Sequence, residues 1–247
     1  MATFKRLFIA LVSISIILCS SVVTFAAETS EPIRGVLWIF AANDGGSSSW
    51  NSSGHAFLLF RNISSSKIKI GGLNVNIGDD ITFGTWGNKS QHTGIWYNLE
   101  SYFVNEQNAY TNRVSLSVNV TSSDIEKINT YISENDKWSV FSNCSSFAVG
   151  VWNMISSTKL SAGSPNTPTS LRGSIMKQSN YELGRRIAYT IPVGYVNSDG
   201  AFVQVTMTNS AKSIGDYEIS TTNGPAKFVV PINTNPNSME MDLDSIF

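Results

Sequence analysis

The chain contains two cysteines, and only Cys144 lies outside the apolar segment at the amino terminus, which includes Cys19. With a single remaining thiol no intramolecular disulfide can form, so the mature chain must be held together by a hydrophobic core. The roughly 220 residues that follow the segment are enough for one domain with such a core. An unpaired cysteine in an exported protein is deeply buried, bridges to another molecule, or acts as a nucleophile.

The amino-terminal segment predicts export. Lys5 and Arg6 precede an uncharged apolar run from Leu7 to about Val23, and small residues follow it. This pattern is typical of a secretory signal peptide, here residues 1–26. The alternative is an uncleaved anchor, because the run is nearly long enough to span a bilayer. We expect a secreted, cell-surface or otherwise extracytoplasmic protein with no stable membrane insertion after signal removal.

Charge and the positions of possible ligand residues argue against nucleic acid and metal ions as binding partners. The formal net charge is −1 and the basic residues are scattered, which argues against nucleic acid as a partner. Two histidines and one cysteine, all widely separated, do not form a zinc site. The pair Asp79 and Asp80 lies in a predicted turn and fits no calcium-binding loop. We therefore expect no metal and no cofactor, and the sequence does not indicate an oligomeric state.

Alternating apolar residues predict a series of short strands in the first half of the chain. A hairpin is expected where two of these runs are joined by Gly71 and Gly72. The pattern favours an antiparallel sheet and an α+β fold class. The predicted strands cover residues 35–40, 55–60, 67–70, 73–77, 81–86 and 114–120.

Two helices are predicted in the second half, and a weaker third over 171–178. Thr121 and Asp124 have the spacing of a capping box before a helix over 125–135. Asn143 is a good N-cap residue for a helix that runs to about Ser156, which places Cys144 in the first turn. Helix and strands together predict one domain over residues 33–185. A β-rich extension over 186–232 and a disordered acidic tail over 233–247 are expected to follow.

The position of Cys144 favours a nucleophilic role. A helix amino terminus stabilises a thiolate, and the backbone amides around Asn143, Cys144 and Ser145 are candidates for an oxyanion hole. The thiol also needs a base, for which imidazole is suited. His55 opens a predicted strand, whereas His92 lies in a predicted loop, so we favour His55 because a rigid element positions a base better. The alternatives are a buried core cysteine and a structural histidine.

These residues resemble a known superfamily. The segment Gly54-His55-Ala-Phe-Leu-Leu-Phe, a following strand, and Asn143-Cys144-Ser-Ser-Phe-Ala resemble the circularly permuted papain-like cysteine hydrolases. That superfamily includes NlpC-type cell-wall peptidases and lecithin:retinol acyltransferase-like enzymes. The resemblance implies a papain-like permuted fold, an antiparallel sheet packed on the helix that carries the nucleophile. It also implies Cys144 as nucleophile, His55 as base, and a polar residue on the next strand that orients the imidazole. Thr85 is one candidate for that third role, and His92 is the other.

The resemblance also implies a peptide or acyl substrate. We expect a cysteine hydrolase that cleaves an amide or peptide bond, with cell-wall peptide as the suggested substrate. Trp86 and Trp96 are candidates for lining a substrate cleft, although tryptophans also pack small β cores. Two other functions stay open, a lipid acyltransferase or thioesterase that uses the same pair, and a non-catalytic surface-binding protein. Since Asn143 also satisfies the glycosylation pattern and a glycan there would block the site, a bacterial host is expected.

Overall fold

The computed structural model describes residues 30–43, 54–88, 91–106, 108–190, 192–208 and 228–231. The chain divides into two units, 1–31 and 32–247, and the description below concerns the second. The predicted signal peptide and acidic tail lie outside the described residues, as do parts of the predicted extension.

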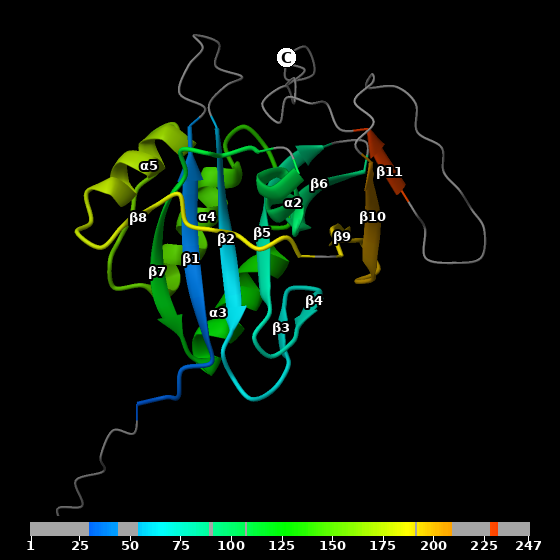
Figure 1. Cartoon of the computed structure of the whole chain (residues 1–247), viewed down its shortest axis with the longest axis horizontal. Helices are drawn as coiled ribbons and strands as arrows, with labels where there is room; N and C mark the ends of the chain where they lie inside the picture. Colours follow the sequence, from blue (N-terminus) through cyan, green and yellow to red (C-terminus); the bar gives the residue numbers. More distant parts are fainter. Residues whose placement is uncertain are drawn as a thin grey trace, which may run out of the picture. The chain divides into compact units, whose positions relative to one another are not determined.

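One large sheet dominates the described part of the chain (Figure 1). Its strands follow the order β11-β10-β9-β6-β5-β2-β1-β7-β8, and all neighbours pair antiparallel except β10 and β11. A separate hairpin is formed by β3 (Ile68–Ile70) and β4 (Leu73–Val75). The strands of the large sheet are β1 (Gly35–Ala42), β2 (His55–Asn62), β5 (Asp80–Asn88), β6 (His92–Tyr97), β7 (Val114–Val120), β8 (Glu182–Leu183), β9 (Gly194–Val196), β10 (Phe202–Thr208) and β11 (Phe228–Pro231).

The sheet is covered on both faces, because its central strands are apolar on both sides. In β1, Leu37 and Ile39 belong to one buried cluster, while Trp38 and Phe40 belong to a second. Such alternation follows from the period of two of a strand, and strands buried on both faces appear as continuous apolar runs. The predicted α+β class with an antiparallel sheet is confirmed.

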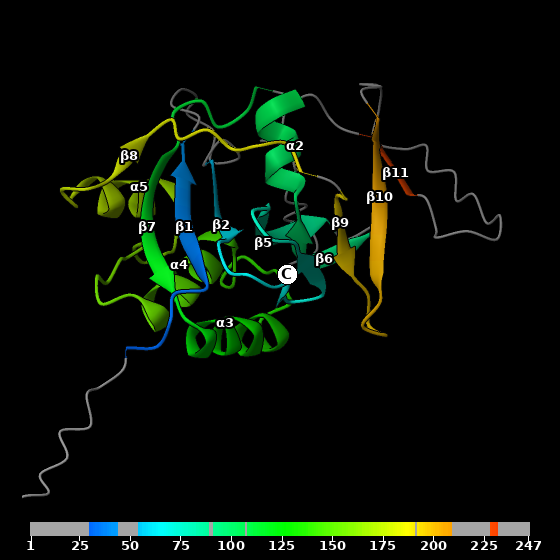
Figure 2. The ribbon, with the colours of Figure 1, turned by 60° about the horizontal axis from the view of Figure 1, so that its bottom comes forward.

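Different helices cover the two faces of the sheet (Figures 1 and 2). The first cluster contains apolar side chains of α3 (Ser122–Glu134), α4 (Cys144–Ile155) and α5 (Pro168–Met176). The second contains side chains of α2 (Leu99–Glu106) and of the chain between Ile187 and Val205. A helix that begins at Cys144 and one that begins at Leu99 therefore approach the sheet from opposite sides.

The structure contains the predicted hairpin and helices, and two further elements, β6 and α2, that the sequence did not predict. The capping box, the helix at Cys144 and the hairpin at Gly71 are confirmed, and the third helix begins at Pro168 with Thr167 as N-cap, three residues earlier than predicted. The prediction that His92 lies in a loop is wrong, because His92 is the first residue of β6. The short helix α2 was not predicted. Strands β9 and β10 of the predicted extension join the large sheet through β6.

The cap of α3 gives the first prediction. Thr121 Oγ1 accepts a hydrogen bond from the Asp124 amide, and the Asp124 carboxylate accepts one from the Thr121 amide. We expect Thr121→Ala to lower the free energy of unfolding by about 1 kcal/mol, measured by urea denaturation. Thr130→Ala, the same substitution at an exposed position within α3, serves as the control and should leave stability unchanged or slightly higher. Equal losses for both variants would contradict the assigned cap.

Candidate active site

Cys144 is the first residue of α4 and is partly exposed. The side chain of Asn143 caps the helix by accepting the amides of Ser145 and Ser146 at 3.0 and 3.1 Å. The cap therefore uses two of the free amides of the first turn. No described residue accepts a hydrogen bond from the Cys144 amide. Of the amides expected to hold an oxyanion, that of Ser145 is occupied by the cap and that of Cys144 is available.

His55 is the first residue of β2 and is held on several sides. Gly54 precedes it with φ +76°, where a Cβ atom would collide with the Ala42 carbonyl of β1, so this close approach requires glycine. The imidazole lies 4.1 Å from the Trp86 ring, centroid to centroid, and 5.7 Å from the Tyr110 ring. With 6% of its surface exposed, His55 has a fixed position at the end of the strand.

The structure brings Cys144 and His55 together. The thiol and the imidazole lie close enough for each to shift the pKa of the other, and the backbone amide of Ala56 also lowers the pKa of the thiol. The Ser145 hydroxyl lies 3.9 Å from the sulfur. Along β2, pairing with β5 begins only at Leu58, two residues after Ala56. The Ala56 amide is consequently available to the sulfur at the point where the β2–β5 ladder ends.

The ionisation of the pair follows from these contacts. Burial raises the pKa of the Cys144 thiol, but His55, the Ala56 amide and the Ser145 hydroxyl together outweigh it, so the net pKa is lowered. Burial lowers the pKa of His55, but Cys144 and Glu100 outweigh it and raise the pKa to about 9. Both directions favour a thiolate beside an imidazolium.

Glu100 supplies the third member of the site. It lies in the first turn of α2 and has no exposed surface. His55 Nε2 lies 3.1 Å from its Oε1, and the Trp86 indole donates to the same oxygen at 2.9 Å. The Thr82 hydroxyl donates to Oε2 at 2.9 Å. A glutamate at this point of the sequence would ordinarily be a solvated charge, but β2 and β5 enclose Glu100 and supply all three partners.

The residues proposed to orient the imidazole do not contact it. Thr85 is 1% exposed, and its hydroxyl has no hydrogen-bond partner. His92 instead lies 2.9 Å from Asp136 through Nε2 and stacks on Tyr195 at 4.7 Å between ring centroids. Because Nε2 of His55 faces Glu100, its other ring nitrogen, Nδ1, is the one available to the thiol. Glu100, and neither Thr85 nor His92, is the residue whose polar group contacts the imidazole.

Trp86 and Trp96 do not line a cleft. They are 4% and 1% exposed and pack in the second cluster, where Trp86 contacts both His55 and Phe103. Trp96 packs against Tyr195 and donates to the His92 carbonyl. Trp86 thus supports the imidazole from within the core, and neither ring offers surface for a substrate.

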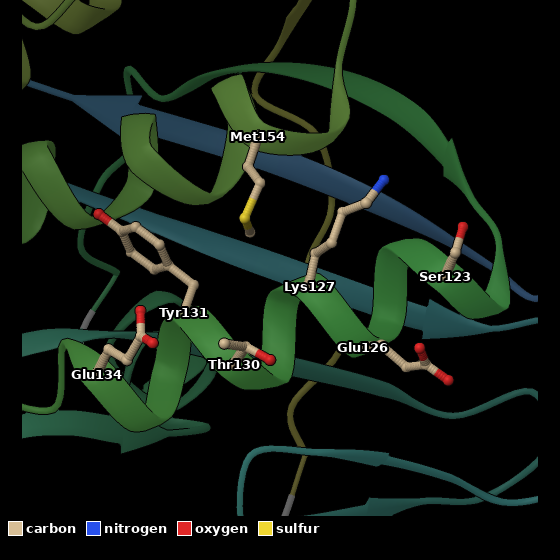
Figure 3. Close-up of a pocket in the computed structure, with 7 residues that line it drawn as sticks. All are labelled: Ser123, Glu126, Lys127, Thr130, Tyr131, Glu134 and Met154. Carbon is tan, nitrogen blue, oxygen red and sulfur yellow. The ribbon is translucent and has the colours of Figure 1, made fainter.

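A surface pocket lies away from the pair (Figure 3). It has a volume of about 390 Å³ and lies between α3 and α4, with Tyr131 and Met154 among its lining residues. Met154 follows Cys144 by ten residues of helix, which corresponds to about 15 Å along the axis. We therefore do not assign this pocket to the reaction.

The part of the chain that the structure describes contains neither a cluster of metal ligands nor a helix that could cross a membrane. There, no three His, Cys, Asp or Glu side chains come together to hold a metal ion. None of its helices combines the length and the apolar character needed to cross a membrane.

The hydrogen bond from His55 to Glu100 gives the second prediction. Glu100→Gln keeps the shape of the side chain but removes the charge that favours the imidazolium, so the thiolate loses support. We expect the pH of half-maximal alkylation of Cys144 by iodoacetamide to rise by about one pH unit. The measurement is the alkylation rate between pH 5 and 10, followed by mass spectrometry.

Thr85→Val is the matched control for this experiment. It removes a buried hydroxyl without a partner at nearly constant shape, so we expect unchanged alkylation and a gain in unfolding free energy of about 1 kcal/mol. A change in the alkylation profile with Thr85→Val but not with Glu100→Gln would reassign the orienting role to Thr85.

Comparisons with known proteins do not assign the chain to a family. No protein-family model matches the chain, and neither the curated proteins nor the solved structures contain a significant match. The case for a function therefore depends on the contacts among Cys144, His55 and Glu100.

Proposed function

We propose that the chain is a cysteine hydrolase that cleaves an amide or peptide bond through a thioester on Cys144. The observation that carries the proposal is the contact of a partly exposed thiol with an imidazole whose other nitrogen faces a buried carboxylate. A nucleophile, a base and a group that orients the base form the minimal set for such catalysis. A non-catalytic protein that merely kept the fold would have no need of this buried arrangement.

The first half of the reaction uses the thiolate and the imidazolium. The sulfur of Cys144 attacks the substrate carbonyl carbon and forms a tetrahedral intermediate, whose oxyanion accepts the Cys144 backbone amide. As the intermediate collapses, the C–N bond breaks and the imidazolium of His55 gives its proton to the leaving amine. The products are a thioester on Cys144 and a free amine.

The second half uses water. Neutral His55 takes a proton from a water molecule, whose oxygen attacks the thioester carbonyl. The C–S bond then breaks, the carboxylic acid leaves, and the thiolate and imidazolium are restored. Glu100 supports both halves, because its bond to Nε2 keeps Nδ1 directed at the sulfur and stabilises the imidazolium.

The fold proposed for this activity is the permuted papain-like one, with histidine before cysteine in the chain. An antiparallel sheet, a histidine that opens a strand and a cysteine that opens a helix packed on that sheet support it. One feature departs from the pattern, because the orienting group comes from α2 and not from the strand after His55. By analogy with the family, we propose an extracytoplasmic bacterial enzyme that acts on peptide in the cell wall.

The ionisation of the pair gives the third prediction. Because the pKa of Cys144 is lowered, alkylation by iodoacetamide should reach its plateau well below the free-cysteine pKa of about 8.5. Because the pKa of His55 is raised to about 9, hydrolysis should fall as the pH rises through about 9, where the proton for the leaving amine is lost. Rates of both reactions between pH 4 and 11 test these two limits.

Two histidine variants provide the comparison. His55→Ala removes the charge that lowers the thiol pKa, so half-maximal alkylation should move to pH 8.5 or higher. His92→Ala, whose imidazole pairs with Asp136, should keep the wild-type profile. A thiol that is inert, or that neither substitution affects, would rule out the proposed mechanism.

The covalent intermediate gives the fourth prediction. On mixing with p-nitrophenyl acetate, the sulfur should displace p-nitrophenolate and carry one acetyl group, which water then releases as acetate. Mass spectrometry should find the acetyl group on Cys144 at early times and lose it later. In Glu100→Gln both steps should slow, and in Cys144→Ala the adduct should be absent. Acetylation that persists in Cys144→Ala would place the nucleophile elsewhere.

A further inference from the structure

Phe141 is an aromatic side chain left in solvent next to the candidate nucleophile. It is 87% exposed, more than any other large apolar side chain in the described part of the chain, where Leu183 follows with 64%. Isolated exposed apolar residues are common on protein surfaces. Phe141 differs because of its position, three residues before Cys144, and because of the way its loop is held.

Hydrogen bonds close the turn that carries Phe141. The Ser139 amide donates to the Ser142 carbonyl at 3.0 Å, and the Ser142 amide donates to Ser139 Oγ at 2.9 Å. Asn143 Nδ2 donates to the Val140 carbonyl at 3.3 Å, so the residue that caps α4 also holds the turn. The backbone on both sides of Phe141 is therefore fixed relative to Cys144.

The beginning of the same loop is tied to the large sheet. Asp136 Oδ1 accepts the Ile95 amide of β6 at 2.7 Å. Trp138 lies against β5 at Gly87, where a Cβ atom would come within 2.8 Å of its ring. Within this loop, Trp138 is half-buried against the sheet, whereas Phe141 is left free of such packing.

The location limits what Phe141 can contact. Three residues of extended chain span at most about 11 Å, so its Cα lies within that distance of the Cα of Cys144. Trp86 and Trp96 are buried and offer no surface. Phe141 is thus an exposed aromatic side chain that the chain holds within about 11 Å of Cys144, Cα to Cα.

We propose that Phe141 is a specificity-determining residue, which binds a bulky apolar group of the substrate beside the carbonyl that Cys144 attacks. The inference rests on the proposed function and names the substrate class, an acyl compound or peptide with an aromatic or branched apolar group near the scissile bond. Covering about half of a phenylalanine ring in this way favours such a substrate by about tenfold. A membrane surface fits less well, because stable anchoring needs more than one apolar group and the loop carries a single basic residue, Lys137.

A pair of reagents with the same electrophile tests the proposal. The purified protein is alkylated with iodoacetamide and with N-benzyl-iodoacetamide, and the rate constant of the benzyl reagent is divided by that of iodoacetamide. This ratio is then divided by the same ratio measured for N-acetylcysteine, which corrects for the intrinsic reactivity of the two reagents. We expect a value of about ten in favour of the benzyl reagent for the wild type. The value should fall to about one in Phe141→Ser and lie between the two in Phe141→Leu, which keeps an apolar side chain.

Ile77→Ser is the matched control, because Ile77 is an exposed apolar residue (59%) in the turn before β5. It should keep the wild-type ratio. An equal ratio in wild type and Phe141→Ser would overturn the inference, as would sedimentation with phosphatidylglycerol vesicles that depends on Phe141 while the ratio stays near one. The pH profile with iodoacetamide separates the two levels of the argument. A lowered thiol pKa with an unchanged ratio overturns the role of Phe141 alone, whereas a thiol that behaves as free cysteine overturns the proposed function and this inference together.

Discussion

The hydrogen bond between His55 and the buried carboxyl group of Glu100 is the interaction on which the rest of the site depends. Burying a carboxylate costs several kcal/mol unless its oxygens are hydrogen-bonded. Here the donors are the imidazole, the Trp86 indole and the Thr82 hydroxyl, which belong to two neighbouring strands. The carboxylate can therefore be accommodated only when α2 lies against β2 and β5 in this position. The same bond fixes the imidazole ring and leaves Nδ1 for the thiol of Cys144.

The charges of the site are arranged so that each anion meets a helix amino terminus. Cys144 opens α4, and Glu100 lies in the first turn of α2 on the opposite face of the sheet. Both helix dipoles thus favour negative charge, and the single imidazolium of His55 lies between the two anions. The Ala56 amide and the Ser145 hydroxyl, which lies 3.9 Å from the sulfur, lower the pKa of the thiol further. Net negative charge in a largely buried site is tolerated because backbone and hydroxyl dipoles compensate for the missing cation.

Much of the fold could be predicted from the sequence, because local signals dominate there. The continuous apolar run of β1, the capping box at Thr121 and the N-cap Asn143 are short-range patterns with direct structural causes. The pair of Cys144 and His55 could be predicted for a similar reason, since each opens an element. The strand β6 was missed because His92 and Gly94 interrupt its apolar pattern. In addition, one of its backbone amides, that of Ile95, donates to the side chain of the distant Asp136. Such long-range contacts leave little trace in a local window.

Glu100 was not predicted because the resemblance to the papain-like hydrolases implies an orienting group on the strand that follows His55. Side chains alternate along β5, so the positions that face the imidazole are Gly84 and Trp86, while Thr85 points to the other face. A Cβ atom at Gly84 would lie 2.7 Å from Glu100 Oε1, so any larger residue would displace the carboxylate. The absence of a side chain on the strand creates the space that α2 fills with an acid. A polar group missing from the expected strand, together with glycine at its centre, is therefore a signal that the partner comes from another element across the sheet.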